Sequence, residues 1–298
     1  MQSKECSRKD DGRAPFISEK VAKPESLNNV KRHYRRYGMA PDVLRGVLAG
    51  LEKPDFILIT SIMTYWYEGT REVVRIARES FPKSKTIVGG IYPSLCSELA
   101  QITLRDADLI VGAHDLQKVY TFIEHAAELS LPYQPRMQDI DMLPYPCYDL
   151  YDTIPFVPLL TSFGCAFKCS YCATPYMYPD IIRRTPSSTL TEIKHWQSKG
   201  VNRYVIYDDS FLYDRERYAK PLLKSIQKLH RLPDIYNPNA MNAAFIDQEL
   251  AEQLIGAGFK EVRIGFETAD PEIQRATGGK VTLKNFEKAL SALWSAGF

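Results

Sequence analysis

Three cysteines lie close together near the middle of the chain, at Cys165, Cys169 and Cys172, with the spacing C-x3-C-x2-C. Residues 155–162, an apolar run typical of a strand, precede them, and Gly164 allows a sharp turn between strand and cysteines. Thiolates this close on a loop can converge on one inorganic centre, and three of them suit a [4Fe–4S] cluster, which normally takes four cysteines. The pattern therefore predicts a cluster with one iron open to a ligand from outside the protein.

Zinc is the main alternative for these cysteines. A zinc ion takes four tetrahedral ligands, and the fourth would have to come from a distant residue such as Cys147 or His195. A disulfide does not account for three clustered cysteines. The six cysteines of the chain, three of them clustered, favour metal chemistry in a reducing cytoplasm. Cys6 and Cys96 stand apart from the cluster, like Cys147, and we interpret these three as a tail thiol and two core or loop residues.

Strand and helix patterns alternate over residues 155–298 and place acidic side chains at strand ends. The second predicted strand, 204–207, ends at Asp208 and Asp209, and the fourth, 261–268, contains Glu267 near its end. Four such units predict part of a (β/α) barrel, in which the carboxyl ends of the strands build the active site. The third strand is expected near 235–239. Helices are expected over 190–198, 247–257 and 283–296, and another helix is expected after the second strand, ending at 229.

An acidic residue at a strand end is by default a helix cap or a surface group. Asp208, Asp209 and Glu267 differ from that default because their strand ends are expected to face the same cleft as the cysteine loop. Thr189 and Glu192 have the spacing of a capping box for the helix at 190–198.

The cysteine loop, with Tyr171 just before its last cysteine, resembles the signature loop of the radical S-adenosylmethionine (radical SAM) superfamily. The resemblance implies that the open iron binds the amino and carboxylate groups of SAM. It further implies that one electron cleaves SAM to methionine and a 5′-deoxyadenosyl radical. Tyr171, Asp208, Asp209 and Glu267 are then expected to bind SAM, the aspartates at its amine and Glu267 at its ribose. The two aspartates and the segment around Glu267 are similar to the cobalamin-associated branch of the superfamily.

Residues 41–130 predict a smaller α/β domain of the doubly wound, Rossmann-like type. This half resembles the cobalamin-binding domain that precedes many radical SAM domains. The resemblance implies that Ser61, Gly89 and Gly90 approach the corrin and its nucleotide tail. The chain lacks the Asp-x-His-x-x-Gly motif of many cobalamin proteins, so a domain that only supports the barrel is the alternative. Its strands are expected at 56–60, 86–88 and 108–111, and its helices at 72–81 and 116–128.

The remaining segments connect or precede these domains. Residues 1–40 are interpreted as a polar tail, loosely ordered over about residues 1–29, and the proline-rich residues 131–154 as a semi-rigid linker. A radical SAM barrel usually has six strand–helix units, and the related cobalamin domain opens with one more unit than is found here. The resemblance therefore implies a chain that is truncated at both ends, with four barrel units present.

Composition sets the broad class of the protein. With 298 residues, 45% of them hydrophobic and 25% charged, the chain is predicted to be globular and cytoplasmic, with no membrane span and no signal peptide. A net charge of +2 argues neither for nor against a nucleic-acid partner. The basic and aromatic run at 31–37 is interpreted as a solvated face.

Together these observations predict a radical SAM iron–sulfur enzyme, with cobalamin as a candidate third cofactor for methyl transfer or another radical modification. Such an enzyme needs a one-electron reductant of the flavodoxin or ferredoxin type. The alternatives are a catalytically impaired fragment that binds a cluster without turnover, and a zinc-binding nucleic-acid module. Arg184 is a further candidate for binding a carboxylate or phosphate, and Gly278-Gly279-Lys280 is interpreted as a plain loop before a helix. The sequence does not indicate the substrate or the oligomeric state.

Overall fold

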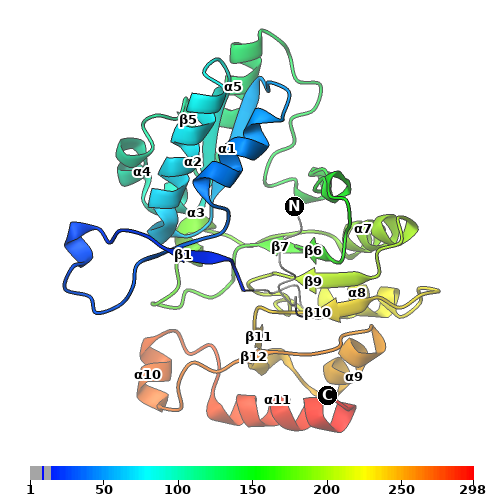
Figure 1. Cartoon of the computed structure of the whole chain (residues 1–298). Coiled ribbons are helices and arrows are strands. Elements are labelled where there is room, and N and C mark those ends of the chain that lie inside the picture. Colours follow the sequence, from blue (N-terminus) through cyan, green and yellow to red (C-terminus); the bar gives the residue numbers. More distant parts are fainter. Residues whose placement is uncertain (1–8, 10–14) are drawn as a thin grey trace. The chain divides into compact units, whose positions relative to one another are not determined.

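The computed structural model describes residue 9 and residues 15–298, so Cys6 lies outside the described residues (Figure 1). The described residues divide into two compact units. The first, which we call the N-terminal unit, ends at Gln134, and the second, the C-terminal unit, begins at Pro135.

A three-stranded parallel sheet forms the centre of the N-terminal unit, with the strand order β3-β4-β5. Its register pairs Phe56 with Lys85 at one end and Ser61 with Gly90 at the other. The core beside it contains Val74, Val88 and Tyr92. The three strands and the two helices that the sequence predicts for this unit are present, as β3, β4 and β5 and as α2 and α5. The elements are α1 (Pro41–Ala49), β3 (Phe56–Ser61), α2 (Tyr67–Ser80), β4 (Lys85–Gly90), α3 (Ile91–Leu95), α4 (Ser97–Thr103), β5 (Leu109–Ile110) and α5 (Leu116–Ala127).

Two strands precede this sheet, β1 (Ser18–Lys20) and β2 (Arg35–Tyr37), and they pair antiparallel. Arg36 forms ion pairs with Glu19 and Glu72. The prediction that residues 1–29 are loosely ordered is therefore wrong at β1. The reason is that the pairing joins strands that are well separated along the chain, which no local periodicity reports.

Parallel strands also form the centre of the C-terminal unit, in the order β10-β9-β6, with β11 and β12 paired beside them as a two-stranded sheet. Strand pairs and following helices confirm the predicted α/β architecture, and the described strands do not close into a barrel. The elements are β6 (Val157–Leu159), α7 (Pro186–Ser198), β9 (Arg203–Ile206), α8 (Ala219–Ile226), β10 (Asp234–Tyr236), β11 (Met241–Asn242), α9 (Gln248–Gly256), β12 (Ile264–Gly265), α10 (Pro271–Ala276) and α11 (Leu283–Ala296).

The first predicted strand of this unit is interrupted. It continues after β6 as β7 (Ser162–Phe163), which pairs antiparallel with β8 (Ile182–Arg183), and α6 (Thr174–Met177) lies between these two strands. At the interruption, the N–H of Thr161 donates to the carboxylate of Asp208, a residue distant in sequence, at 2.6 Å. The cysteine loop lies in the segment that connects β7 to β8, so the pairing of these two strands holds both ends of that segment together.

The capping-box prediction for α7 is wrong. The helix begins at Pro186, and Thr185 caps it by accepting a hydrogen bond from the N–H of Ser188. Thr189 lies inside the helix, where its hydroxyl bonds the phenol of Tyr218 at 3.0 Å. Proline at the first helical position, which favours a helix start, is the signal that outweighed the Thr-x-x-Glu spacing.

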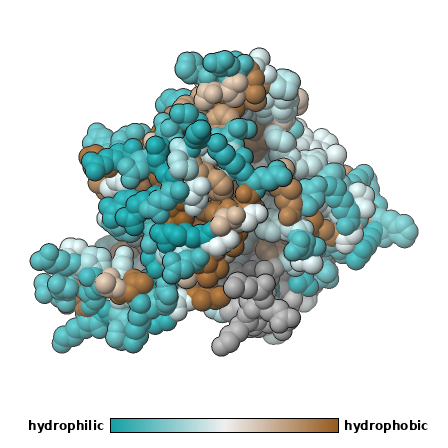
Figure 2. All heavy atoms as spheres, turned by 45° about the horizontal axis from the view of Figure 1, so that its top comes forward, coloured by the Kyte–Doolittle hydropathy of each residue, from teal (hydrophilic) through white to brown (hydrophobic). Residues whose placement is uncertain are grey.

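The proline-rich segment contributes to the C-terminal core over its second half. Ile140 is buried, and Tyr145 and Tyr148 pack against the main hydrophobic cluster. Trp196, Tyr204 and Ile235 lie at the centre of that cluster and are almost completely buried. Among the described residues, no helix is long and apolar enough to cross a membrane. The face drawn in Figure 2 is mostly hydrophilic, with apolar side chains in separate patches.

Candidate functional site

The cysteine loop leaves β7 through a turn that requires glycine. Gly164 has a φ of +83°, and a Cβ atom there would lie 2.6 Å from the carbonyl oxygen of Asp180. Only glycine adopts this conformation at such close approach without strain. Cys169 is buried with 8% of its surface exposed, whereas Cys165 and Cys172 are partly exposed.

Hydrogen bonds hold the second half of the loop. The N–H of Cys172 donates to the carbonyl of Cys169 at 3.0 Å. The sulfur of Cys172 accepts a hydrogen bond from the backbone N–H of Thr174 at 3.5 Å, and its thiol donates to the hydroxyl oxygen of Thr174 at 3.4 Å. The N–H of Thr174 can also donate to this sulfur when the sulfur binds a metal.

The donor set fits an iron–sulfur cluster better than a single ion. Three soft thiol ligands on one loop are the chemistry that such clusters require. Within 15–298 no group of three or more His, Cys, Asp or Glu side chains is gathered around one point as a single ion needs. A four-iron cube does not need such a point, because each cysteine binds a different iron. Beside the loop is an open hollow of about 360 Å³, lined by Lys168, Cys169, Ser170, Cys172, Pro175, Tyr176 and Pro179.

The two aspartates at the end of β9 have different surroundings. Asp208 is 3% exposed and accepts hydrogen bonds from the N–H and hydroxyl of Thr161 and from the hydroxyl of Ser162, the last at 2.9 Å. Burial raises the pKa of Asp208, and these bonds oppose the rise. Its carboxylate is fully occupied in joining β9 to the segment that leads into the cysteine loop.

Asp209, the next residue, remains at the surface. Its carboxylate accepts a hydrogen bond from Thr174, the residue that also approaches Cys172, at 3.4 Å. Although the side chain reaches solvent, desolvation by the surrounding protein raises the pKa of Asp209, against that hydrogen bond and the charge of Lys280. Asp209 therefore faces the cysteine loop, as the sequence predicts for both aspartates.

Tyr171 and Glu267 are brought together at the same place. The pKa of Tyr171 is raised, mainly by partial desolvation and next by hydrogen bonds to Cys169 and Glu267. The ring is still 54% exposed. Tyr171, Asp209 and Glu267 thus surround the cysteine loop with groups that can accept hydrogen bonds or stack on a ring.

Arg184 does not have the role considered for it in the sequence. Its guanidinium is buried and pairs with the carboxylate of Glu192, and it also donates to Ser188. A buried, paired guanidinium is not available to a ligand. His195 packs its ring against Tyr145 and Trp196, at 5.2 and 4.9 Å between centroids.

Two of the predicted cobalamin residues of the N-terminal unit, Ser61 and Gly90, pack on each other. Ser61 is 2% exposed and accepts a hydrogen bond from the hydroxyl of Thr70 at 3.1 Å. Gly90 has a φ of +109°, and a Cβ atom there would lie 2.6 Å from the carbonyl oxygen of Ser61. Gly89 faces Val111 at an ordinary contact distance. The glycine at position 90 is needed for the close approach of β3 and β4.

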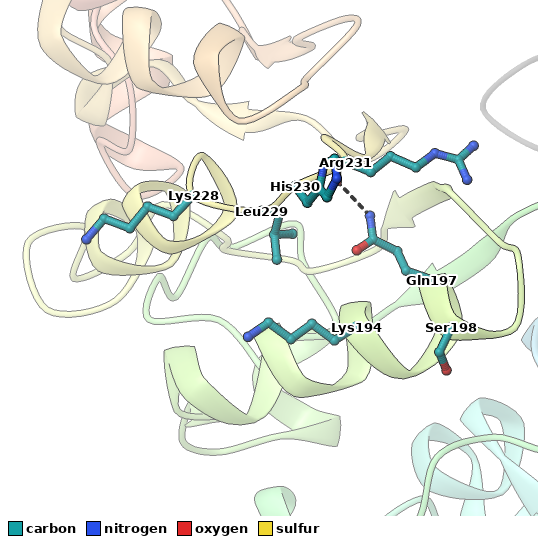
Figure 3. A pocket seen from close by; sticks show the side chains of 7 residues that line it. All are labelled: Lys194, Gln197, Ser198, Lys228, Leu229, His230 and Arg231. Carbon is teal, nitrogen blue, oxygen red and sulfur yellow. Dashed lines mark hydrogen bonds between the residues drawn. The ribbon is translucent and has the colours of Figure 1, made fainter.

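A larger hollow, about 700 Å³, lies between the C-terminal ends of α7 and α8 (Figure 3). Gln197 donates to the carbonyl of Arg231 across it at 2.9 Å. This hollow lies toward the amino ends of β9 and β10, whereas sites in such folds form at the carboxyl ends. It is lined by Lys194, Gln197, Ser198, Lys228, Leu229, His230 and Arg231.

Three residues of the site were missed by sequence reasoning: Thr161, Thr174 and Gly278. Thr161 donates hydrogen bonds to Asp208, and Thr174 donates to Asp209 with its hydroxyl and to Cys172 with its N–H. Gly278 lies against Cys169. Thr174, two residues after the last cysteine, had a recognisable position, but the other two become visible only through contacts between distant segments.

Comparison with known families defines the class of this unit. Residues 159–298 match the model of the Radical SAM superfamily. This part of the chain is therefore a radical SAM domain, which confirms the predicted resemblance.

Curated relatives match different shares of the chain. An uncharacterised methyltransferase of Pyrococcus horikoshii is 23% identical over 276 residues, which are 82% of this chain and 59% of the relative. Bacteriochlorophyllide d C-12(1)-methyltransferase of Chlorobaculum tepidum is 30% identical over 142 residues, 46% of this chain and 30% of that enzyme.

Two solved structures share the fold. TsrM of Kitasatospora setae, a radical S-adenosylmethionine methyltransferase, superposes with a TM-score of 0.68 at 17% identity, over 87% of this chain and 58% of TsrM. OxsB, a cobalamin-dependent S-adenosylmethionine radical enzyme, has a TM-score of 0.63 at 15% identity, over 86% of this chain and 41% of OxsB. The likeness covers both units, and this chain spans less than two thirds of the length of either protein.

Proposed function

We propose that the chain is the cofactor-binding part of a radical SAM enzyme. Cys165, Cys169 and Cys172 would hold a [4Fe–4S] cluster, and SAM would bind at its open iron. The observation that carries the proposal is the three-cysteine loop at the carboxyl end of β7, within residues that match the Radical SAM model. When bound, the cluster supplies the electron that cleaves SAM.

The roles of the surrounding residues follow from their contacts. Asp209 faces the cysteine loop and can bind the ammonium of SAM through a charge-assisted hydrogen bond. Glu267 can accept hydrogen bonds from the ribose hydroxyls, and Tyr171 can cover the ligand with its exposed ring. Asp208 does not contact SAM in this proposal, because its carboxylate is buried and occupied; it positions the strand that leads to the cysteines.

We extend the proposal to methyl transfer with cobalamin as a further cofactor. Its support is the names of the relatives, three of them methyltransferases and one cobalamin-dependent, and the likeness of fold over both units. Ser61, Gly89 and Gly90 would lie near the corrin, as backbone rather than as reactive side chains. The enzyme would need a one-electron reductant of the flavodoxin or ferredoxin type, and its substrate is open.

The zinc-binding nucleic-acid module is the less favoured function. Its basic run would present Arg35 and Arg36 to phosphates, yet Arg35 donates to Ser18 and Arg36 pairs with two glutamates. A chain that binds a cluster without turnover is the other alternative, and the following experiment separates it.

The experiment is anaerobic reconstitution with iron and sulfide, followed by reduction, addition of SAM and measurement of 5′-deoxyadenosine. We expect about four irons per chain and formation of the product. A cluster without product would leave the non-catalytic alternative, and zinc retained without uptake of iron would contradict the proposal. Addition of hydroxocobalamin, with a bound corrin spectrum at one per chain as the expected result, tests the N-terminal unit.

A further inference from the structure

A short loop between α10 and α11, residues 277–280, lies against the cysteine loop. The carbonyl of Thr277 accepts a hydrogen bond from the N–H of Ser170 at 3.3 Å. A Cβ atom added to Gly278 would lie 3.2 Å from the Cα and 3.6 Å from the sulfur of Cys169. The two segments can approach this closely because residue 278 has no side chain.

Lys280 extends this contact to the end of β12. Its Nζ lies 3.7 Å from Oε1 of Glu267, and 21% of the lysine side chain is exposed. The charge of Lys280 also acts on the carboxylate of Asp209. The ammonium of Lys280 therefore attracts two carboxylates, those of Glu267 and Asp209, which lie at the ends of different strands.

Both ends of this loop are anchored. On one side the N–H of Gly279 donates to the carbonyl of Gln274, near the end of α10, at 2.7 Å. On the other side Val281 is 5% exposed within the main core, and Thr282 caps α11 through the N–H of Asn285. A segment anchored in this way can hold a neighbour in place, which a free surface loop cannot.

We propose that residues 277–280 form a clasp that positions Cys169 as a ligand and ties the cysteine loop to the carboxylates of the site. The clasp rests on the proposed function in one respect, namely that Cys169 binds the cluster. The contact itself can be tested in metal-free protein, so that failure of one proposal is distinguishable from failure of the other.

Gly278 and Gly279 provide a matched pair of variants. Both have positive φ, +123° and +62°, but a Cβ atom at Gly279 would have nothing within 4 Å. Alkylation of Cys169 in reduced, metal-free protein, followed by peptide mass spectrometry, reports how often the loop opens. We expect Gly278→Ala to raise this rate about tenfold, equivalent to about 1.4 kcal/mol. Gly279→Ala is expected to leave it close to the wild-type rate. An unchanged rate in folded Gly278→Ala protein would overturn the proposal.

A second measurement does not depend on how the variant folds. In the wild-type chain, hydrogen exchange of the Ser170 amide is expected to be slow, because this N–H is bonded to Thr277. Fast exchange of that amide would equally overturn the clasp. Lys280→Met is expected to raise the alkylation rate only about twofold, since a partly exposed ion pair contributes little, and Lys284→Met on α11 is its control.

Reconstituted protein adds a cofactor readout. We expect Gly278→Ala to bind less iron and sulfide than Gly279→Ala and to show an altered electron paramagnetic resonance spectrum after reduction. If wild-type protein takes up no iron while Cys169 still responds to Gly278→Ala, the proposed function fails and the clasp stands. If iron uptake is normal in every variant and alkylation is unchanged, the clasp fails alone.

Discussion

The two units use the carboxyl ends of their parallel strands differently. In the N-terminal unit, Ser61 and Gly90 meet each other there, with the serine hydroxyl bonded to Thr70 and buried. In the C-terminal unit, Asp208 is buried in the same manner, but Asp209 and the cysteine loop that follows β7 stay accessible. A polar residue at a strand end is often buried and hydrogen-bonded, and then it stabilises the fold. A ligand can be bound only by neighbouring residues whose side chains remain accessible.

Adjacent positions divide these two tasks because successive side chains at a strand end point in opposite directions. Asp208 points into the protein and joins two segments, whereas its neighbour points outward toward Thr174. In the N-terminal unit both positions of the Gly89-Gly90 pair lack a side chain, so these two residues can offer a ligand only their backbone.

The largest effect should follow from removal of a proposed cluster ligand. We expect Cys169→Ala to abolish uptake of iron and sulfide during anaerobic reconstitution, because the cluster loses one of three thiolates. Cys96→Ala, in the N-terminal unit, is the matched control and should retain the wild-type iron content. Cluster absorbance that persists in Cys169→Ala would break the contrast between the two units.

The neighbouring aspartates should separate stability from binding. Asp208→Ala is expected to lower the free energy of unfolding of the C-terminal unit by about 3 kcal/mol, since three buried donors lose their acceptor. Asp209→Ala should cost less than about 1 kcal/mol, yet weaken SAM binding in reconstituted protein. Urea unfolding followed through buried Trp196 and equilibrium binding of SAM measure the two quantities. Equal losses of stability would contradict the division of roles.

The glycine pair offers the corresponding test in the N-terminal unit. Gly90→Ala should destabilise that unit by about 2 kcal/mol, because residue 90 has a positive φ and its new Cβ would meet the Ser61 carbonyl. Gly89→Ala meets Val111 only at 3.7 Å and should be nearly neutral. Thermal unfolding compares them. A neutral Gly90→Ala would mean that the strand ends are held less closely than described.

The smallest expected effect is on pH dependence. The pKa of Asp208 is raised from its ordinary value of 3.8, so the folded state binds this proton more tightly than the unfolded state. Its contribution to stability is therefore fully present below the ordinary pKa and is lost as the pH rises through the raised one. The difference in unfolding free energy between wild type and Asp208→Asn should shift in favour of wild type on acidification from neutral pH. A difference independent of pH would contradict the raised pKa.

Much of the fold could be predicted because its signals are local. The continuous apolar run at 56–60 and the helical periodicity at 283–296 depend only on neighbouring residues, and both elements are present as β3 and α11. The β1–β2 pairing and the interruption at Thr161 were not predictable in this way. Each depends on a partner that is distant in sequence, Tyr37 for Ser18 and Asp208 for Thr161.

The sequence by itself determined the chemistry of the site. Cysteine spacing, with the tyrosine before the last thiol, was sufficient to indicate a radical SAM domain, since ligand type and reach are local properties. Tertiary structure alone decided which polar residues are available. It buried Asp208 and Arg184 in contacts of their own, left Asp209 facing the loop, and brought Gly278 against Cys169. The reason is physical: burial and hydrogen-bond saturation depend on which distant segments meet, and residue type does not report that.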